Sequence, residues 1–236
     1  MAKIYKKEAP ESPKPKGSKV FYALAILFAV AGLVLPVAFG VAAVLAVIGI
    51  ALAPGNRSLH NISRAGQAGE NATADFIAQF PDSYSGFQNL KVTYEGKQSE
   101  IDMVVVGPTG VYIIETKNHN GHIRGSFESH DWTQYKVGRA GGQYSKEFYS
   151  PVKQVGTHVY RLAHYLRQRG AQVHVDAMVF FTNPAATVEV YGTPGNIPVY
   201  AGQTGAELIA KQIIGGKPVL SPQTVESVCR LLEQCL

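Results

Sequence analysis

Cysteine is scarce in this chain: its 236 residues include only Cys229 and Cys235. Two cysteines cannot form the disulfide framework typical of small secreted domains, so the sequence favours a reducing compartment. No histidine is surrounded by the cysteine or carboxylate pattern that binds zinc in proteins. We therefore expect no zinc site.

Other features of common enzyme classes are also missing. The chain has no Walker-type phosphate loop and no Gly-x-Ser-x-Gly elbow, which argues against a P-loop nucleotidase and an α/β-hydrolase. A basic excess is missing from most of the chain as well. The formal net charge is +5, but residues 1–56 carry six lysines against Glu8 and Glu11, so residues 57–236 carry only +1. Net charge alone therefore does not indicate nucleic-acid binding.

Charged residues are absent from Val20–Ala53, an apolar run long enough to cross a bilayer. A break near Gly32–Pro36 favours a helical hairpin, and one tilted, kinked helix is the alternative. The preceding lysines place the N-terminus in the cytoplasm by the positive-inside rule, and a hairpin returns the rest of the chain to that side. We expect a disordered Lys/Pro-rich tail at 1–19, a transmembrane segment at 20–53, a linker at 54–62 and a folded domain at 63–236.

Asp102, Glu115 and Lys117 are the most informative residues of the folded part. Two apolar, β-branched runs flank Gly107–Gly110, which predicts a β-hairpin whose turn is centred on Pro108 and Thr109. In that hairpin the numbers of paired residues sum to 217, so Asp102 lies opposite Glu115. Alternation then places Glu115 and Lys117 on one face of the sheet.

Two facing carboxylates at the end of an apolar ladder repel each other and are costly to bury unless a cation lies between them. Carboxylate oxygens suit Mg²⁺, with Mn²⁺ as an alternative. A metal-bound water beside the ammonium group of Lys117 can attack a phosphodiester. The simpler alternative is a solvated cluster of surface charges, because Glu-x-Lys is common on exposed strands.

Further short motifs stand around these residues in a fixed order: Gly66-Gln-Ala-Gly-Glu70, Glu100-Ile-Asp102, Val111-Tyr-Ile-Ile-Glu-Thr-Lys-Asn118, Gly121-His-Ile-Arg-Gly125, Trp132 and Ser150-Pro-Val-Lys-Gln154. Together, over about residues 63–182, they resemble the nuclease-related domain (NERD) family within the PD-(D/E)xK nuclease superfamily. The resemblance implies a metal-dependent nuclease.

The resemblance also implies roles for individual residues. Glu70, Asp102 and Glu115 would be metal ligands, and Lys117 would be the catalytic lysine. Gln154 would help to hold the active site. The Gln-x-x-x-Tyr form seen in some relatives is absent, because His158 stands four residues after Gln154.

Hydrophobic periodicity predicts the order of elements. We expect a helix from Gly66 to about Phe80, strands at 87–94, 100–106 and 111–117, a long loop at 118–150, a helix at 151–169 and a strand at 173–182. Short strands near 188–191 and 198–201 and helices at about 205–214 and 222–235 follow. This order of helix, three-strand meander, helix and strand predicts an α/β, restriction-endonuclease-like sandwich.

The positive charge of the folded part is concentrated just after the Glu-x-Lys motif, since residues 117–169 hold nine basic and three acidic residues. Interleaved aromatic residues make this block suited to tracking a phosphate backbone and stacking bases. The candidate nucleic-acid-binding residues are Arg124, Lys136, Arg139, Lys146 and Lys153. The alternative is an ordinary solvated loop and helix face.

The sequence thus predicts a membrane-anchored, metal-dependent nuclease that hydrolyses phosphodiester bonds on the cytoplasmic side of the membrane, with DNA as the expected substrate and RNA as the alternative. Its expected partners are nucleic acid and, through residues 20–53, the lipid bilayer. The alternative function is a non-catalytic nucleic-acid-binding or membrane scaffold domain that retains the nuclease fold.

Overall fold

The computed structural model describes residues 1–6, 55–138 and 141–236. The chain divides into two compact units, one of residues 1–7 with 66–236 and one of residues 8–65. The predicted transmembrane segment, residues 20–53, lies outside the described residues. Among the helices that are described, none is both long and apolar enough to span a bilayer.

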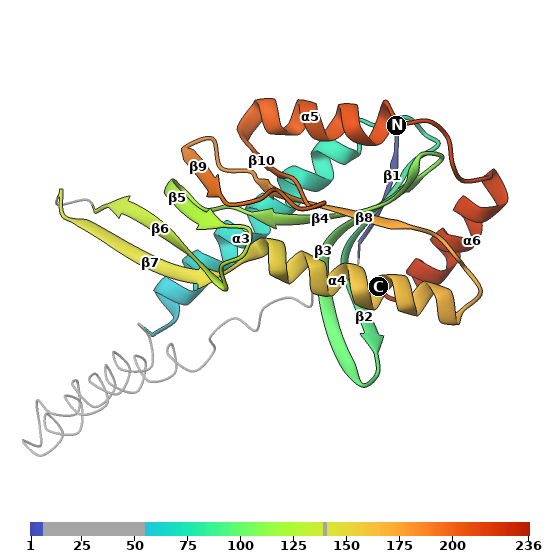
Figure 1. The fold of residues 1–236 in the computed structure, drawn as a ribbon, viewed down its shortest axis with the longest axis horizontal. Coiled ribbons are helices and arrows are strands. Elements are labelled where there is room, and N and C mark those ends of the chain that lie inside the picture. Colours follow the sequence, from blue (N-terminus) through green and yellow to red (C-terminus); the bar gives the residue numbers. More distant parts are fainter. Residues whose placement is uncertain (7–54, 139–140) are drawn as a thin grey trace, which may run out of the picture. The chain divides into compact units, whose positions relative to one another are not determined.

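The first unit is built on a six-stranded sheet with the order β1-β2-β3-β4-β8-β10 (Figure 1). Its strands are β1 (Lys3–Lys6), β2 (Ser85–Tyr94), β3 (Lys97–Gly107), β4 (Gly110–Lys117), β8 (Val175–Phe181) and β10 (Val199–Ala201). Strands β2, β3 and β4 form the predicted antiparallel meander, and β8 runs parallel to β4. The fold is therefore mixed α/β, and its central strands agree with the prediction.

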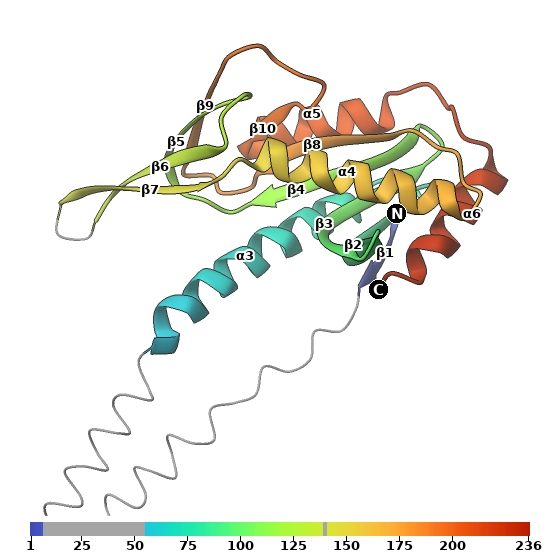
Figure 2. The ribbon, with the colours of Figure 1, turned by 60° about the horizontal axis from the view of Figure 1, so that its bottom comes forward.

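Helices cover both faces of this sheet (Figure 2). α4 (Pro151–Gln168) and α6 (Pro222–Glu233) pack on one face, whereas the C-terminal part of α3 (Gly55–Ile77) and α5 (Gly202–Ile214) pack on the other. The side chain of Ser150 caps α4 by accepting a hydrogen bond from the amide of Lys153, and Pro151 occupies the first turn. A serine cap followed by proline is a strong helix start, which fixes α4 against the strands.

A second sheet corrects the prediction of a long loop at 118–150. Its order is β7-β6-β5-β9, formed by β5 (Gly121–Ser126), β6 (Asp131–Val137), β7 (Gln143–Tyr149) and β9 (Ala186–Tyr191). Trp132 is fully buried, and its ring stacks on that of Phe181 with centroids 6.2 Å apart. Gly125 makes this docking possible, because a Cβ at that position would lie 2.1 Å from the indole ring. The glycine provides packing space here and does not mark a loop.

The predicted disordered tail is wrong for its first residues, since Lys3–Lys6 forms edge strand β1, parallel to β2. The amide of Ala2 donates to the carbonyl of Phe80 at 2.7 Å, and the ring of Tyr5 stacks on Phe87 with centroids 4.7 Å apart. Apolar side chains on both faces of a four-residue strand are enough to add it to an existing edge. Residues 7–19 of the tail lie outside the described residues.

The predicted linker at 54–62 is also corrected. Helix α3 begins at Gly55, so residues 55–62 are helical. No proline follows Pro54 in this stretch, so nothing in the backbone stops the helix from extending N-terminally of Gly66.

Candidate active site

The predicted register of β3 on β4 is confirmed for five pairs, from Met103 with Ile114 to Gly107 with Gly110, whose numbers all sum to 217. The predicted pair of Asp102 with Glu115 is not among them. Asp102 stands one residue beyond the last pair, where its Oδ2 accepts a hydrogen bond from the amide of Thr116 at 2.8 Å. The carboxylate of Asp102 thus accepts the hydrogen bond of a β4 backbone amide at the point where the pairing of β3 with β4 ends.

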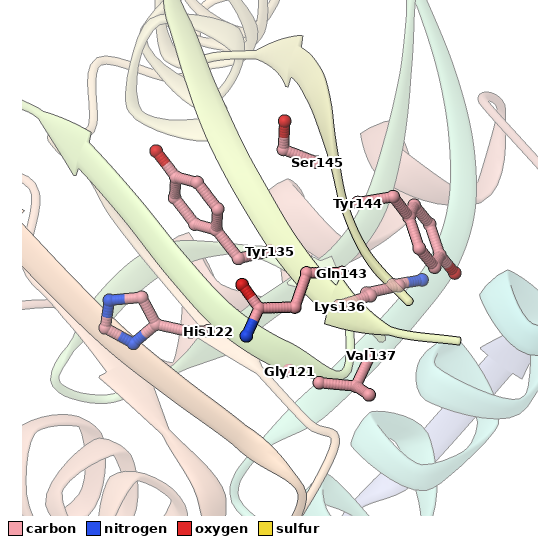
Figure 3. A pocket seen from close by; sticks show the side chains of 8 residues that line it. All are labelled: Gly121, His122, Tyr135, Lys136, Val137, Gln143, Tyr144 and Ser145. Carbon is pink, nitrogen blue, oxygen red and sulfur yellow. The ribbon is translucent and has the colours of Figure 1, made fainter. Parts of the chain in front are cut away.

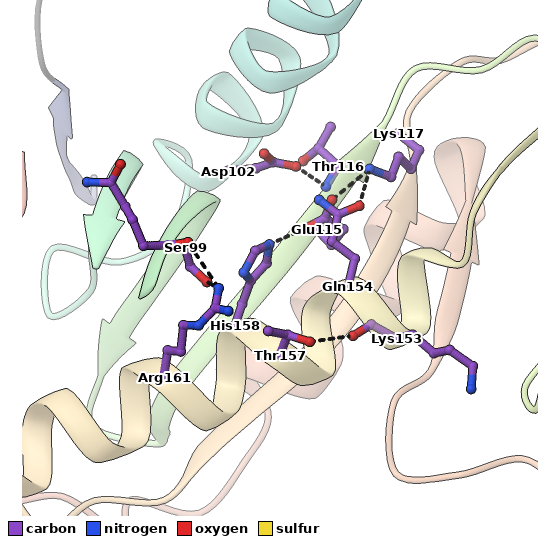
Figure 4. A network of polar contacts seen from close by, with 11 residues as sticks. Ser99, Asp102, Glu115, Thr116, Lys117, Lys153, Gln154, Thr157, His158 and Arg161 are labelled. Carbon is purple, nitrogen blue, oxygen red and sulfur yellow. Dashed lines mark hydrogen bonds and ion pairs between the residues drawn. The ribbon is translucent and has the colours of Figure 1, made fainter. Parts of the chain in front are cut away.

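Glu115 and Lys117 project from β4 toward helix α4 (Figure 4). Glu115 has no exposed surface, and its Oε1 accepts a hydrogen bond from Lys117 Nζ at 2.7 Å. Lys117 Nζ also donates to Oε1 of Gln154 at 2.9 Å. Gln154 therefore fixes the lysine although the Gln-x-x-x-Tyr form is absent.

His158 was not predicted as part of the site, yet it lies beside Glu115. Its Nε2 is 3.4 Å from Glu115 Oε2, and neither atom has a hydrogen bond with protein, so the pair is a close electrostatic contact. Four residues of helix rise about 6 Å, and two residues of strand about 6.6 Å. The distance from Gln154 to His158 along α4 is therefore close to the distance from Lys117 to Glu115 along β4. Both spacings can be read from the sequence.

The two carboxylates have pKa values shifted in opposite directions. Burial, followed by the charge of Glu115, raises the pKa of Asp102 to about 8, although Lys117 and the amide of Thr116 act against the shift. Burial also tends to raise the pKa of Glu115, but His158 and Lys117 outweigh it and the net shift is downward. Without a cation, Glu115 is therefore ionised at neutral pH and Asp102 mostly holds a proton.

This environment fits a divalent cation. Glu115 Oε2 is buried without a hydrogen-bond partner, and Asp102 is held protonated chiefly because charge is costly at its buried position. A hard cation would satisfy the free oxygen and favour the ionised form of both acids. The ligand chemistry is that of Mg²⁺ or Mn²⁺.

Glu70 lies on α3, which packs on the opposite face of the sheet. Gly69 allows a close approach, because a Cβ there would lie 2.8 Å from Cβ of Asn118. Glu70 is close enough to Asp102 to be the weakest of the influences that raise its pKa. Within the described parts of the chain, however, no group of three or more His, Cys, Asp and Glu residues gathers closely enough to hold a metal. The structure thus brings Asp102, Glu115, Lys117 and Gln154 together. Glu70 lies outside this group and acts on it only weakly, through Asp102.

The candidate nucleic-acid-binding residues that the structure describes lie on different strands and on helix α4. Lys136 and Lys146 lie on β6 and β7, and both influence the pKa of His119, two residues after Lys117. Arg124 is hydrogen-bonded to the hydroxyl of Tyr191, and Lys153 acts on the pKa of Glu128. Arg139 lies outside the described residues.

A sheet that brings an Asp and a Glu-x-Lys pair against the following helix is consistent with the PD-(D/E)xK nuclease superfamily. The model of the nuclease-related domain matches residues 65–182, half of the chain, and the chain belongs to that family.

One curated relative, an uncharacterized protein of Bacillus anthracis, is 39% identical over 71 residues. The match covers 29% of this chain and 34% of the relative, so the chain spans about a third of that protein's length. No solved structure is significantly similar to the chain.

Proposed function

We propose that this protein is a metal-dependent nuclease that hydrolyses phosphodiester bonds, in DNA rather than RNA. The observation that carries the proposal is the buried pair Asp102 and Glu115, with Lys117 held beside it by Gln154. Its membership in the nuclease-related domain family supports the reaction class. A restriction-endonuclease-like sandwich is the corresponding proposal for the fold.

Asp102 and Glu115 would hold the cation, and Glu70 would act as a third acid directly or through water. Bound Mg²⁺ would supply charge stabilisation at the phosphate and a water of lowered pKa. Lys117 orients the attacking water, since its ammonium group is fixed by hydrogen bonds to Glu115 and Gln154. Its positive charge also favours the negative charge that develops on the phosphate oxygens.

The test is cleavage by the full chain of linear, circular and single-stranded DNA and of RNA, with Mg²⁺, Mn²⁺ or EDTA. Lys117→Ala should lower the rate with Mg²⁺ by about 10²–10³-fold, the usual effect of removing one group that stabilises the transition state. Lys91→Ala is the matched control, because Lys91 is exposed on β2, belongs to neither set of candidate site residues, and donates its backbone amide to the carbonyl of Cys235. An unchanged rate in Lys117→Ala would contradict the proposal. A wild type inactive with every metal would favour the non-catalytic scaffold.

We further propose that residues 20–53 anchor the protein in a lipid bilayer and return to the side from which they entered. The charge-free run supports insertion. The pairing of β1 with β2 supports the return, because residues before and after the run belong to one compact unit and a single crossing would separate them. The lysines before the run favour the cytoplasmic side.

Labelling of engineered cysteines in intact cells tests this topology. In a background with Cys229 and Cys235 replaced by Ser, Lys3→Cys and Lys97→Cys occupy exposed positions on either side of the run. Both should resist a membrane-impermeant maleimide until the cells are opened. Labelling of one but not the other in intact cells would contradict the two-pass topology.

A further inference from the structure

The four-stranded sheet has two chemically different faces. We call the inner face the one that carries Trp132 and Ile123, which are fully buried against the core. Strand alternation and the pairing of β6 with β7 place Lys136, opposite Tyr144, and Lys146, opposite Gln134, on this inner face. The outer face is the reverse side, where His122, Tyr135 and Ser145 form a row across three strands.

The two faces carry opposite charge. Among the residues of β5, β6, β7 and β9, the inner face has Lys136 and Lys146 and no carboxylate. The outer face has a single arginine, Arg124, and the carboxylates of Asp131, Glu147 and Glu189. Arg124 already forms an ion pair, because its Nε lies 3.4 Å from Glu189 Oε2.

A pocket of about 450 Å³ lies where the two faces meet at one end of this sheet (Figure 3). His122, Tyr135 and Ser145 line it from the outer face, and Lys136 and Tyr144 line it from the inner face. The positive charge in the lining of this pocket therefore comes from Lys136 of the inner face.

The inner face continues into the candidate active site. Burial first, and then the charges of Lys117, Lys136 and Lys146, lower the pKa of His119 to about 4. The His119 imidazole is therefore neutral at pH 7, and His119 stands two residues after Lys117. The His119 ring lies edge-on to Phe148, also on the inner face, and its Nδ1 is buried without a hydrogen-bond partner.

We propose that the inner face of the four-stranded sheet is the surface over which nucleic acid passes as it leaves the acid pair, with Lys136 and Lys146 binding its backbone phosphates. His119 connects this face with the acid pair, because it follows Lys117 by two residues and its ring lies 4.5 Å from that of Phe148, centroid to centroid. This inference rests on the proposed nuclease function and adds a direction to it. The substrate path runs from Lys117 along the inner side of β6 and β7 beyond the buried Trp132, where Lys146 is exposed, and not across the outer face.

The test is binding of a fluorescein-labelled DNA duplex to the full chain in EDTA, measured over a series of salt concentrations. Each phosphate contact adds about 0.9 to the slope of log affinity against log salt, which is about 10-fold in affinity at 0.1 M salt. Lys136→Ala with Lys146→Ala should therefore reduce the slope by about 2 and weaken binding by about 50–100-fold. Lys136→Arg with Lys146→Arg should restore binding, which excludes a merely structural effect.

Tyr135→Ala is the control on the outer face, since it removes an exposed ring from strand β6, which also carries Lys136. It should bind DNA within about 2-fold of wild type, as expected when no phosphate contact is lost. The proposal is overturned if the double lysine variant binds like wild type or if Tyr135→Ala loses more affinity than the double lysine variant. Failure of the proposed function is distinguishable, because it would abolish metal-dependent cleavage in wild type while leaving the lysine-dependent binding intact.

Discussion

The two sheets of this protein differ in what covers them. Helices pack on both faces of the six-stranded sheet, and Glu115 in its interior has no exposed surface. The four-stranded sheet docks one face on the core through Trp132, and its other face exposes side chains such as Tyr135 and Tyr191.

In the proposed nuclease, this difference separates two tasks, the binding of a cation and the binding of nucleic acid. Shifting the pKa of a carboxylate to about 8, as at Asp102, requires burial and a neighbouring charge, which only the covered sheet offers. Binding a long polyanion requires cations that solvent and substrate can reach, and Lys146 on the four-stranded sheet is exposed. Trp132 connects the two sheets, because it fixes the four-stranded sheet to the six-stranded one.

The largest expected effect is therefore that of Trp132→Ala. Deleting a fully buried indole that stacks on Phe181 should lower the free energy of unfolding by about 3–5 kcal/mol. Denaturant unfolding of the full chain measures this loss. Tyr135→Ala on the exposed side of the same strand should cost less than about 0.5 kcal/mol. Equal losses in the two variants would show that the four-stranded sheet is not held through its inner face.

The second effect is a pH dependence that belongs to the covered sheet. The folded-state pKa of Asp102, about 8, is above its ordinary value of 3.8, so between these values the folded state binds a proton that the unfolded state has released. The stability from this group is present below about pH 4 and is lost as pH rises toward 8. In EDTA the free energy of unfolding should fall by about 2–4 kcal/mol from pH 5 to pH 8 on account of Asp102.

Denaturant unfolding of Asp102→Asn at the same two pH values checks this prediction, because the amide cannot titrate and most of the fall should disappear. Asp131→Asn, at an exposed residue of the four-stranded sheet, should retain the wild-type slope. A wild-type slope in Asp102→Asn would mean that the buried acid is ionised without a cation.

The smallest effect concerns the edge of the covered sheet. Tyr5→Ala removes a ring stacked on Phe87 and should destabilise the chain by about 1–2 kcal/mol. Lys6→Ala removes an exposed hydrogen bond to Asn71 and should cost less than about 0.5 kcal/mol. Thermal unfolding compares the two variants. If Tyr5→Ala were as stable as wild type, β1 would contribute nothing to the sheet.

The sequence predicted the parts of the fold that depend on local pattern. The register of β3 on β4 follows from the turn at Pro108 and Thr109, and α4 follows from Ser150 and Pro151 at its start. Both were predictable because a short stretch of sequence determines each one. The same logic placed Asp102 beside the strand that carries Glu115 and Lys117.

The missed parts depend on contacts between distant residues. The strands of the second sheet contain glycine, serine and charges, and what makes them strands is the docking of Trp132 on Phe181. Strand β1 is only four residues long with lysine at each end, and it exists because β2 offers an edge. His158 reaches Glu115 only through the packing of α4 on β4, although its spacing from Gln154 carried the signal.

The most direct test of the central claim is a calorimetric titration of the full chain with Mn²⁺ and Mg²⁺ at pH 8, comparing wild type with Asp102→Asn, Glu115→Gln and the exposed-site control Asp131→Asn. The acid pair as cation site predicts that wild type and Asp131→Asn bind the metal alike, and that the other two variants each bind at least about 10-fold more weakly. Binding as tight as wild type in both Asp102→Asn and Glu115→Gln would contradict it.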